Sequence, residues 1–141
     1  MSSGLRIKLE IDKNNQWFAS VWVTLQNRSK QVRFKVDTGC NAVVLSHKTL
    51  QKLGLSVASA DLEKLKSVTG KQASGEKHTF KELGMVSLYL YKDHTTHVCN
   101  TEAICHATRA TNDLLGTEVL NQFMDVNFRL SDDKYMELLK T

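Results

Sequence analysis

The chain has 141 residues, of which 41% are hydrophobic and 24% are charged, and its formal net charge is +4. This is the balance of an ordinary globular domain, and no apolar run reaches the roughly 18 residues that a membrane-spanning helix needs. The charges are scattered, without the block of like charges that marks a nucleic-acid-binding arm. We therefore expect a single domain over residues 1–141, with neither a membrane nor a nucleic acid as its partner.

The start of the chain gives an expectation about location. The segment MSSGLRIKLEI lacks the apolar stretch of a signal peptide, so the chain as given is predicted to be cytoplasmic. Residues 1–4 are expected to be disordered or left over from cloning. The three cysteines, Cys40, Cys99 and Cys105, are odd in number and have no framework spacing, which argues against a disulfide scaffold.

Hydrophobic patterning predicts strands in the first part of the chain. Apolar and polar residues alternate over 5–11 and again over 31–36, which is the period of a half-buried strand. The segment 17–25 is rich in aromatic and β-branched residues, which favour strands. Polar clusters at 12–15 and 26–30 separate these segments and predict turns.

Short strands and two short helices are predicted in the rest of the chain. Ser46 is a suitable cap for a helix over 47–53, and Gly54 is a suitable C-terminal stop. The polar, glycine-containing segment 66–77 predicts a hairpin or a mobile loop. The remaining expected elements are an apolar run at 42–45, strands at 84–91 and 98–105, a helix at 118–123, and a hairpin of strands 126–130 and 135–138. This arrangement predicts an all-β barrel or sandwich.

An Asp-Thr-Gly triplet, Asp37 to Gly39, ends the strand 31–36 and is followed at once by the apolar run. A triplet of common residues is a weak signal, because Asp and Gly both favour turns and a surface turn is the simpler interpretation. A surface turn, however, needs neither an apolar strand before it nor an apolar run and a capped helix after it. The flanking segments therefore favour an acid placed for chemistry.

The stretch FKVDTGCNAVVLS, followed by HKTLQKLGL, resembles the active-site segment of retropepsin-like aspartic proteases. Three later stretches agree with that family in order: SVTGKQASG at its flap, the strand GMVSLYL, and LLGTEVLNQF followed by VNFRL. The resemblance covers roughly residues 15–140. It implies a small closed acid-protease barrel, all-β with one or two short helices, and the activity of an aspartic endopeptidase.

The resemblance also implies roles for individual residues. Asp37 would be the catalytic acid, with Thr38 and Gly39 supporting the active site, and the loop 68–74 would be the flap. The expected substrate-binding and flap residues are Asn41, Val68, Thr69, Gly70 and Lys71, with Gly70 near the flap tip. Leu115 and Gly116 would be structural, behind the site. Two positions depart from the family: Cys40 replaces the usual Ala or Ser, and Asn41 stands where viral members often have Asp.

The number of catalytic carboxylates predicts a dimer. Hydrolysis of an amide by activated water needs one group to deprotonate the water and another to protonate the carbonyl oxygen, and two carboxylates that share one proton supply both. The chain contains one Asp-Thr-Gly and no second copy of such a triplet. The second acid would then come from another copy in a C2 homodimer that binds an extended polypeptide. This mechanism needs no metal or organic cofactor.

Two other functions remain open on the sequence. One is a noncatalytic module that keeps the fold and binds or dimerises without cleaving. The other is a metal protein, because zinc accepts the residue types found at His94, His97, Cys99, Cys105 and His106. Their spacing matches no finger pattern, and strand alternation places His97 and Cys99 on one face and Val98 on the other. Trp17, Phe18 and Trp22 are expected to fill a core or a dimer contact.

Overall fold

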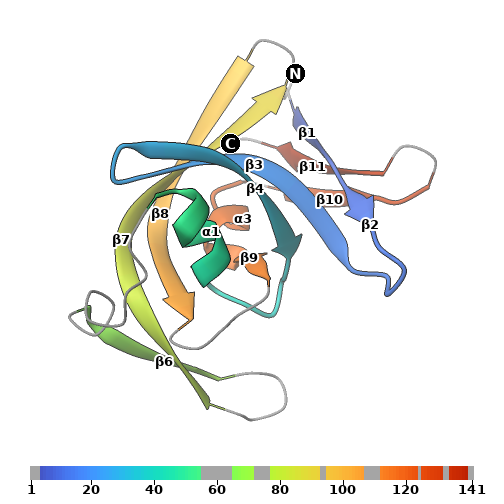
Figure 1. The fold of residues 1–141 in the computed structure, drawn as a ribbon. Coiled ribbons are helices and arrows are strands. Elements are labelled where there is room, and N and C mark those ends of the chain that lie inside the picture. Colours follow the sequence, from blue (N-terminus) through green and yellow to red (C-terminus); the bar gives the residue numbers. More distant parts are fainter. Residues whose placement is uncertain are drawn as a thin grey trace.

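The computed structural model describes residues 4–54, 65–71, 77–92, 95–106, 112–123, 125–131 and 134–139 (Figure 1). The elements in chain order are β1 Gly4–Lys8, β2 Glu10–Ile11, β3 Trp17–Leu25, β4 Arg28–Val36, β5 Val43–Leu45, α1 His47–Lys52, β6 Ser67–Lys71, β7 Lys77–Lys92, β8 Thr95–His106, β9 Asp113–Leu115, α3 Thr117–Leu120, β10 Asp125–Arg129 and β11 Tyr135–Leu139. The described residues are therefore mostly β, with two short helices among them, as the sequence predicts.

Six strands close into a barrel. They pair in the order β3-β4-β9-β5-β8-β7, and β7 pairs again with β3 and completes the ring. The pairing of β4 with β9 and of β5 with β8 is parallel, and β9 is antiparallel to β5. Inward-facing residues such as Val23, Phe34 and Leu88 are fully buried. Of the two architectures that the patterning left open, the barrel is the one observed.

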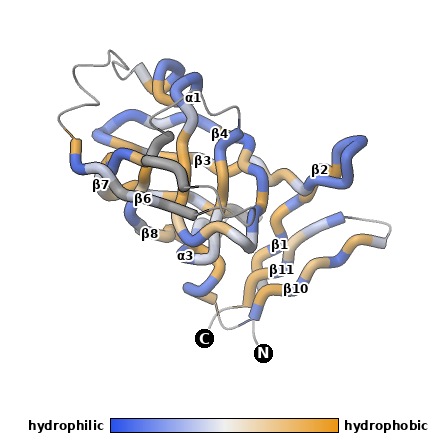
Figure 2. The backbone as a smooth tube through the Cα atoms, turned by 90° about the horizontal axis from the view of Figure 1, so that it is seen from below, coloured by the Kyte–Doolittle hydropathy of each residue, from blue (hydrophilic) through white to orange (hydrophobic). Residues whose placement is uncertain are grey.

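A second sheet packs beside the barrel and has the order β1-β11-β10. Strand alternation gives it one apolar face, to which β1 contributes Leu5 and Ile7, and β11 contributes Met136 and Leu138. All four side chains belong to the same core cluster as the barrel residues. In Figure 2, hydrophobic colouring follows the strands, and hydrophilic colouring marks α1 and the turn next to β2.

Several predicted boundaries need correction. The strand expected over 5–11 is interrupted at Leu9, whose backbone N–H donates to the carbonyl of Lys134 (2.9 Å) instead of continuing one ladder. The turn expected at 26–30 contains only Gln26 and Asn27, both with positive φ, so β4 starts earlier. Strand β7 starts at Lys77 and β8 runs from Thr95 to His106, so both are longer than predicted, and α3 ends at Leu120. The helix cap at Ser46 is confirmed.

Strand β7 bends where it leaves the barrel. Its register with β8 shifts between Glu82 and Gly84, and Gly84 has φ of +103°. A β-bulge with glycine at a positive φ bends and twists a strand at low cost. Beyond the bend, β7 pairs with β6, and this hairpin extends from the lower edge of the barrel in Figure 1.

The three aromatic residues of β3 have different surroundings. Trp17 packs against Phe128 with a ring-centroid distance of 4.8 Å, and Phe18 is buried beneath the guanidinium of Arg33. Trp22 is 43% exposed, so of the two places expected for it the core is excluded, and a dimer contact stays a prediction. It lies between Val21 and Val23, which point into the barrel, and so it faces outward.

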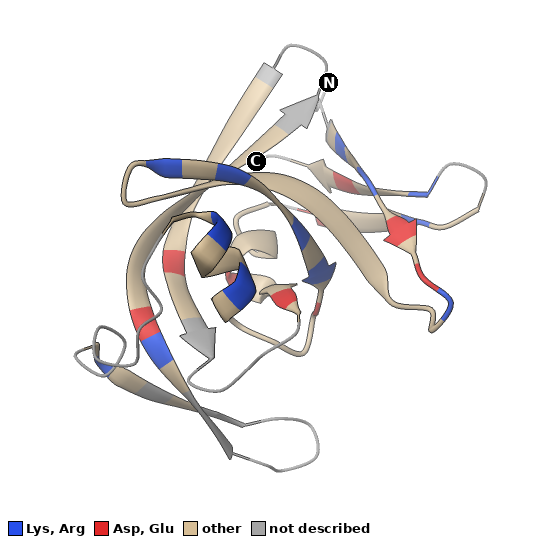
Figure 3. Ribbon diagram, in the orientation of Figure 1, with Lys and Arg blue, Asp and Glu red and all other residues tan. Residues whose placement is uncertain are grey.

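Positive and negative charges are mixed over the described part of the chain. Lys and Arg are interspersed with Asp and Glu on the ribbon rather than segregated by sign (Figure 3). Among the residues with described positions, no helix is both long and apolar enough to cross a membrane.

We predict that Leu138→Ala lowers the free energy of unfolding by about 2–5 kcal/mol, because Leu138 is fully buried and truncation leaves a cavity. The matched control is Leu130→Ala, at a leucine that is 38% exposed, and it should change stability by less than about 0.5 kcal/mol. Urea unfolding of both variants measures the difference. Equal losses would contradict the placement of the second sheet against the barrel core.

Candidate active site

The turn that follows β4 carries Asp37. Its backbone N–H donates to the carbonyl of Leu115 on β9 (3.0 Å), so the ladder between the two strands continues to this residue. One carboxylate oxygen of Asp37 accepts the N–H of Gly39 (2.9 Å), and the Asp37 carbonyl accepts the N–H of Cys40 (3.2 Å). These bonds close a tight turn that fixes both the backbone and the carboxylate of Asp37.

Strand β9 lies directly behind this turn. Leu115 pairs with Val36 of β4 on one side and with Val43 of β5 on the other, and it is buried. At Gly116, a Cβ atom would lie 2.5 Å from the carbonyl oxygens of both Cys40 and Ala42. No side chain fits there, because those oxygens belong to the backbone and have no rotamer to change. Gly116 is therefore required for the close approach of β9 to the turn.

The residues after Gly116 hold the end of the turn. The backbone N–H of Thr117 donates to the carbonyl of Cys40, and that of Glu118 donates to the carbonyl of Asn41, both at 2.8 Å. The Thr117 hydroxyl also donates to the side-chain oxygen of Asn41 (3.4 Å). The first two N–H groups of α3 have no acceptor within the helix, and they donate to carbonyls of the turn instead. Asn41 is therefore exposed, while its carbonyl and its side chain are both bonded to the start of α3.

Asp113 is a positioning residue that the sequence analysis missed. Its two carboxylate oxygens accept the N–H of Ser46 (2.8 Å) and the hydroxyl of Thr49 (2.7 Å) at the start of α1. The Ser46 side chain itself accepts the N–H of Thr49 (3.3 Å). Asp113 therefore joins β9 to α1, and so fixes the strand behind the turn from its other end. The available signal was an Asp placed directly before the Leu-Leu-Gly stretch.

The expected flap residues lie on another element. Residues 67–71 form β6, in which Thr69 pairs with Thr79 of β7 and Gly70 pairs with His78. The last pair is Lys71 with Lys77, so Gly70 stands inside the paired strand, and the connection at 72–76 lies outside the described residues. At the base of the hairpin, the Lys81 ammonium donates to the Ser67 hydroxyl (2.7 Å). The structure thus separates the predicted site residues into a rigid group around Asp37 and a hairpin group on β6.

The surroundings of Asp37 are less apolar than the flanking sequence suggests. Asp37 is half-buried, and Thr38 and Gly39 are exposed. Among the described residues, the backbone bonds that hold the turn come from β9 and the start of α3. The carboxylate is therefore accessible from outside, which a group that must reach a substrate requires.

Cys40, the residue after the triplet, has its thiol under the same turn. Its thiol is partly buried under the turn and donates weakly to the carbonyl of Ala42 (3.5 Å). Burial raises the pKa of this thiol above its ordinary value, and the negative charges of Asp37 and Glu118 act in the same direction, while the bond to Ala42 opposes them. The reactive thiolate form of Cys40 is therefore disfavoured.

The His and Cys residues considered as metal ligands have other surroundings where they are described. The ring of His97 packs against Phe123 with a centroid distance of 5.3 Å, and Cys99 is fully buried in the core. His94 and the side chains of Cys105 and His106 lie outside the described residues. Within the part of the chain that the structure describes, no three His, Cys, Asp or Glu side chains form a group that could hold a metal ion.

Comparison with known sequences identifies the family. The sequence profile described as "gag-polyprotein putative aspartyl protease" matches residues 23–122, which include the turn, β6 and β9. The chain belongs to this aspartyl protease family. A comparison with curated proteins found no match.

The fold of this aspartyl protease family member agrees with solved structures. A retropepsin-like aspartic protease from Rickettsia conorii is 20% identical, with a TM-score of 0.57 over 100% of this chain and 97% of that one. The protein edgp is 10% identical, with a TM-score of 0.50, and the match covers 99% of this chain but only 46% of edgp. At such identities these likenesses establish the retropepsin-like fold.

We predict that Gly116→Ala destabilises the protein by about 1–3 kcal/mol or more, because the new methyl group overlaps two backbone carbonyls. The comparison variant is Gly39→Ala, whose methyl group would lie 3.3 Å from a carboxylate oxygen of Asp37, a side-chain atom that can rotate away. Thermal or urea unfolding should therefore show a clearly smaller loss for Gly39→Ala. Equal stability of the two variants would argue against the close approach of β9.

A second prediction concerns the raised pKa of the Cys40 thiol. Because folding raises this pKa, the folded chain holds the proton more tightly, so the contribution to stability is complete below the ordinary thiol pKa and is lost as the pH rises through the folded value. Cys40→Ser removes the titration. The free energy of unfolding of the wild type, measured relative to this variant by urea unfolding, should fall above about pH 9. A difference that stays constant with pH would contradict the burial of the thiol.

Proposed function

We propose that this protein is an aspartic endopeptidase that cleaves extended polypeptides as a homodimer. The observation that carries the proposal is the placement of Asp37. Its carboxylate is fixed by the Gly39 N–H on a turn that β9 supports from behind, yet it remains half-exposed. A rigidly held, accessible acid on the fold of an aspartyl protease family is what peptide hydrolysis by activated water requires.

The chemistry needs a second carboxylate beside the first. One deprotonated carboxylate removes a proton from water as the water oxygen attacks the peptide carbonyl carbon, and the protonated partner gives its proton to the carbonyl oxygen. Collapse of the resulting diol breaks the carbon–nitrogen bond, with a proton delivered to the leaving nitrogen. Two carboxylates that share one proton perform both transfers and return to their starting state.

A second copy of the chain would supply that group. The chain has one Asp-Thr-Gly, and the exposed side of its turn consists of Thr38 and Gly39 next to the Asp37 carboxylate. In a C2 dimer the same turn from each copy would meet at the axis and bring the two Asp37 side chains together. Thr38 would brace the pair across the interface, and Gly39 would leave room for the substrate backbone.

The substrate would lie between the turn and the β6–β7 hairpin. Strand β6 offers exposed Thr69, and Asn41 is exposed beside Asp37. An extended peptide presents backbone donors and acceptors along its whole length, which suits contact with a hairpin. Closure of the hairpin over the peptide would exclude bulk water from the reaction. This role also includes Val68, Gly70 and Lys71 as flap residues.

We predict that Asp37→Asn abolishes cleavage of a diverse peptide mixture at about pH 5, where a carboxylate pair should hold one proton. The loss should be at least a hundredfold, because an amide cannot accept the proton of water. The control is Glu102→Gln, at an exposed glutamate on β8, which should cleave as the wild type does. Product analysis by mass spectrometry would give the cleavage preference in the same experiment.

Dilution tests the dimer separately. Specific activity of the wild type should fall as the protein is diluted through its dimer dissociation constant, because a monomer holds half of the site. Sedimentation measured over the same concentrations should show dimer loss in parallel.

Cleavage by Asp37→Asn at the wild-type rate would contradict the aspartic mechanism. A folded, dimeric wild type that cleaves no peptide in the mixture would favour the noncatalytic binding module.

A further inference from the structure

The second sheet ends in an edge strand, β10, whose outer side has no partner strand among the described residues. The strand order is β1-β11-β10, so β10 pairs with β11 on one side only. An unpaired strand edge exposes a row of backbone N–H and C=O groups. Such an edge can pair with a strand from another molecule and extend the sheet.

The two faces of β10 differ in character. Val126 and Phe128 lie opposite two buried residues of β11 and pack against the core, yet both remain half-buried. Strand alternation places Asp125, Asn127 and Arg129 on the other face, where the two charged residues are exposed. The open edge therefore combines an apolar face that is incompletely covered with a face that carries one charge of each sign.

The sequence of β10, DVNFR, is complementary to itself when two copies run antiparallel. With Asn127 on the two-fold axis, Asp125 lies opposite Arg129 of the partner subunit. Val126 then lies opposite Phe128 of the partner subunit. Opposite charges and aromatic–β-branched pairs both stabilise neighbouring strands when they face each other directly. Because the axis repeats each pair, the five residues form two ion pairs and two apolar pairs with a second copy of themselves.

The opposite edge of the same sheet lacks this complementarity. Strand β1 has the sequence GLRIK, so the equivalent pairing would place two Arg6 side chains opposite each other. Like charges that face each other directly destabilise a strand pair. Lys8 would lie opposite Gly4, and β1 contains no acidic residue that could pair with either cation. The charges of β1 therefore disfavour self-pairing, while those of β10 favour it.

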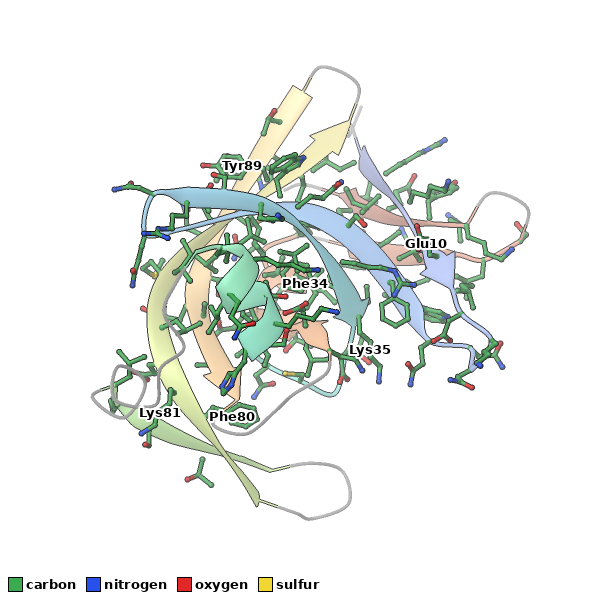
Figure 4. All side chains as sticks on the ribbon, viewed as in Figure 1. Glu10, Phe34, Lys35, Phe80, Lys81 and Tyr89 are labelled. Atoms are coloured by element: carbon green, nitrogen blue, oxygen red, sulfur yellow. The ribbon has the colours of Figure 1, made fainter. Side chains whose placement is uncertain are left out.

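Strand β10 lies beside the end of the barrel that carries Asp37. Phe128 packs against Trp17 with a ring-centroid distance of 4.8 Å. The next residue, Phe18, pairs with Lys35, which is two residues before Asp37. Figure 4 shows Lys35 on the side of the barrel where the second sheet lies. A two-fold axis at the edge of β10 is therefore also near the turn, which is where the proposed active site needs it.

We propose that the protein dimerises by antiparallel pairing of β10 with the β10 of a second copy, centred on Asn127. The two second sheets then join into one sheet of six strands, in the order β1-β11-β10-β10-β11-β1. Val126 and Phe128 cover each other's exposed sides across the axis. The pairs of Asp125 with Arg129 fix the register, because moving the axis by one residue separates both. This inference rests on the proposed homodimeric function and identifies the surface that assembles it.

Each copy enters this dimer with its own fold complete. Strands β1 and β11 stay in their own chain, and their inward residues belong to the core cluster of that chain. The new contact adds strand pairing at an edge and exchanges no element between the copies. Dissociation should therefore give a folded monomer that lacks only the second Asp37.

The test reverses the charges at the two ends of β10. Asp125→Arg and Arg129→Asp each replace both ion pairs of the homodimer with like-charge pairs. Sedimentation equilibrium should give each variant a dimer dissociation constant at least about tenfold above that of the wild type. The two variants shift the net charge in opposite directions, so net charge cannot explain weakening by both. An equal mixture of them should restore dimers, because each mixed dimer again contains two opposite-charge pairs.

The matched control is Lys8→Asp. Lys8 and Arg129 are exposed and pair with the same residue of β11, Tyr135, from its two sides. Lys8→Asp therefore makes the same change of charge in the same row of the sheet, at the edge that we expect to stay free. It should leave the dissociation constant of the dimer unchanged. Circular dichroism would show that all three variants fold.

Several outcomes would overturn the pairing through β10. They are a wild type that stays monomeric, charge variants that dimerise as the wild type does, no recovery in the mixture, and equal weakening by Lys8→Asp. Sedimentation does not involve cleavage, so this result is separate from the result for Asp37→Asn. Charge variants that dimerise normally would reject this interface and leave the proposed peptidase standing. Rescue in the mixture would support the interface even if the protein cleaved no peptide.

Discussion

The candidate site depends on the contact between Gly116 and the turn that carries Asp37. Only a residue without a side chain allows β9 to approach the carbonyls of Cys40 and Ala42 this closely. Because β9 runs between β4 and β5, the same contact joins the strand before the turn to the strand after it. Backbone hydrogen bonds from the residues that follow Gly116 then hold the end of the turn. The position of the Asp37 carboxylate is thus set by main-chain contacts, which vary less than side-chain packing.

Among the described residues, the bonds that support the turn come from β9 and the start of α3, and Thr38 and Gly39 are exposed. The side of the turn away from β9 is exposed, and a second carboxylate brought there would repel the first unless the pair shared a proton. Each copy of the turn already provides a donor to its own carboxylate, the N–H of Gly39. In a symmetric dimer both acids would therefore be stabilised before substrate arrives. Dimer assembly and catalysis would depend on the same three residues, Asp37, Thr38 and Gly39. A change that prevents assembly would therefore also prevent catalysis.

Sequence patterning predicted the elements whose residues alternate strongly, and it failed where distant segments meet. Strand β3 has its predicted bounds because Val21 and Val23 alternate with outward residues, and the same alternation could have placed Trp22 outside. The role of Gly116 followed from family resemblance, since no local pattern reveals a contact with a turn more than 70 residues earlier. Asp113 was missed for the same reason, because its partners Ser46 and Thr49 are 67 and 64 residues away.

Strand β7 belongs to both the barrel and the hairpin, and the bulge at Gly84 separates these two parts. Its inward residues Val86, Leu88 and Leu90 are buried, and its pairing with β3 fixes its barrel half. Beyond the bulge at Gly84, residues 80–84 are only partly buried, and the strand pairs with β6 instead of β3. Motion of the hairpin can therefore be absorbed at the bulge, where few buried contacts would be lost. The barrel half of β7 would keep its geometry while the hairpin opens and closes.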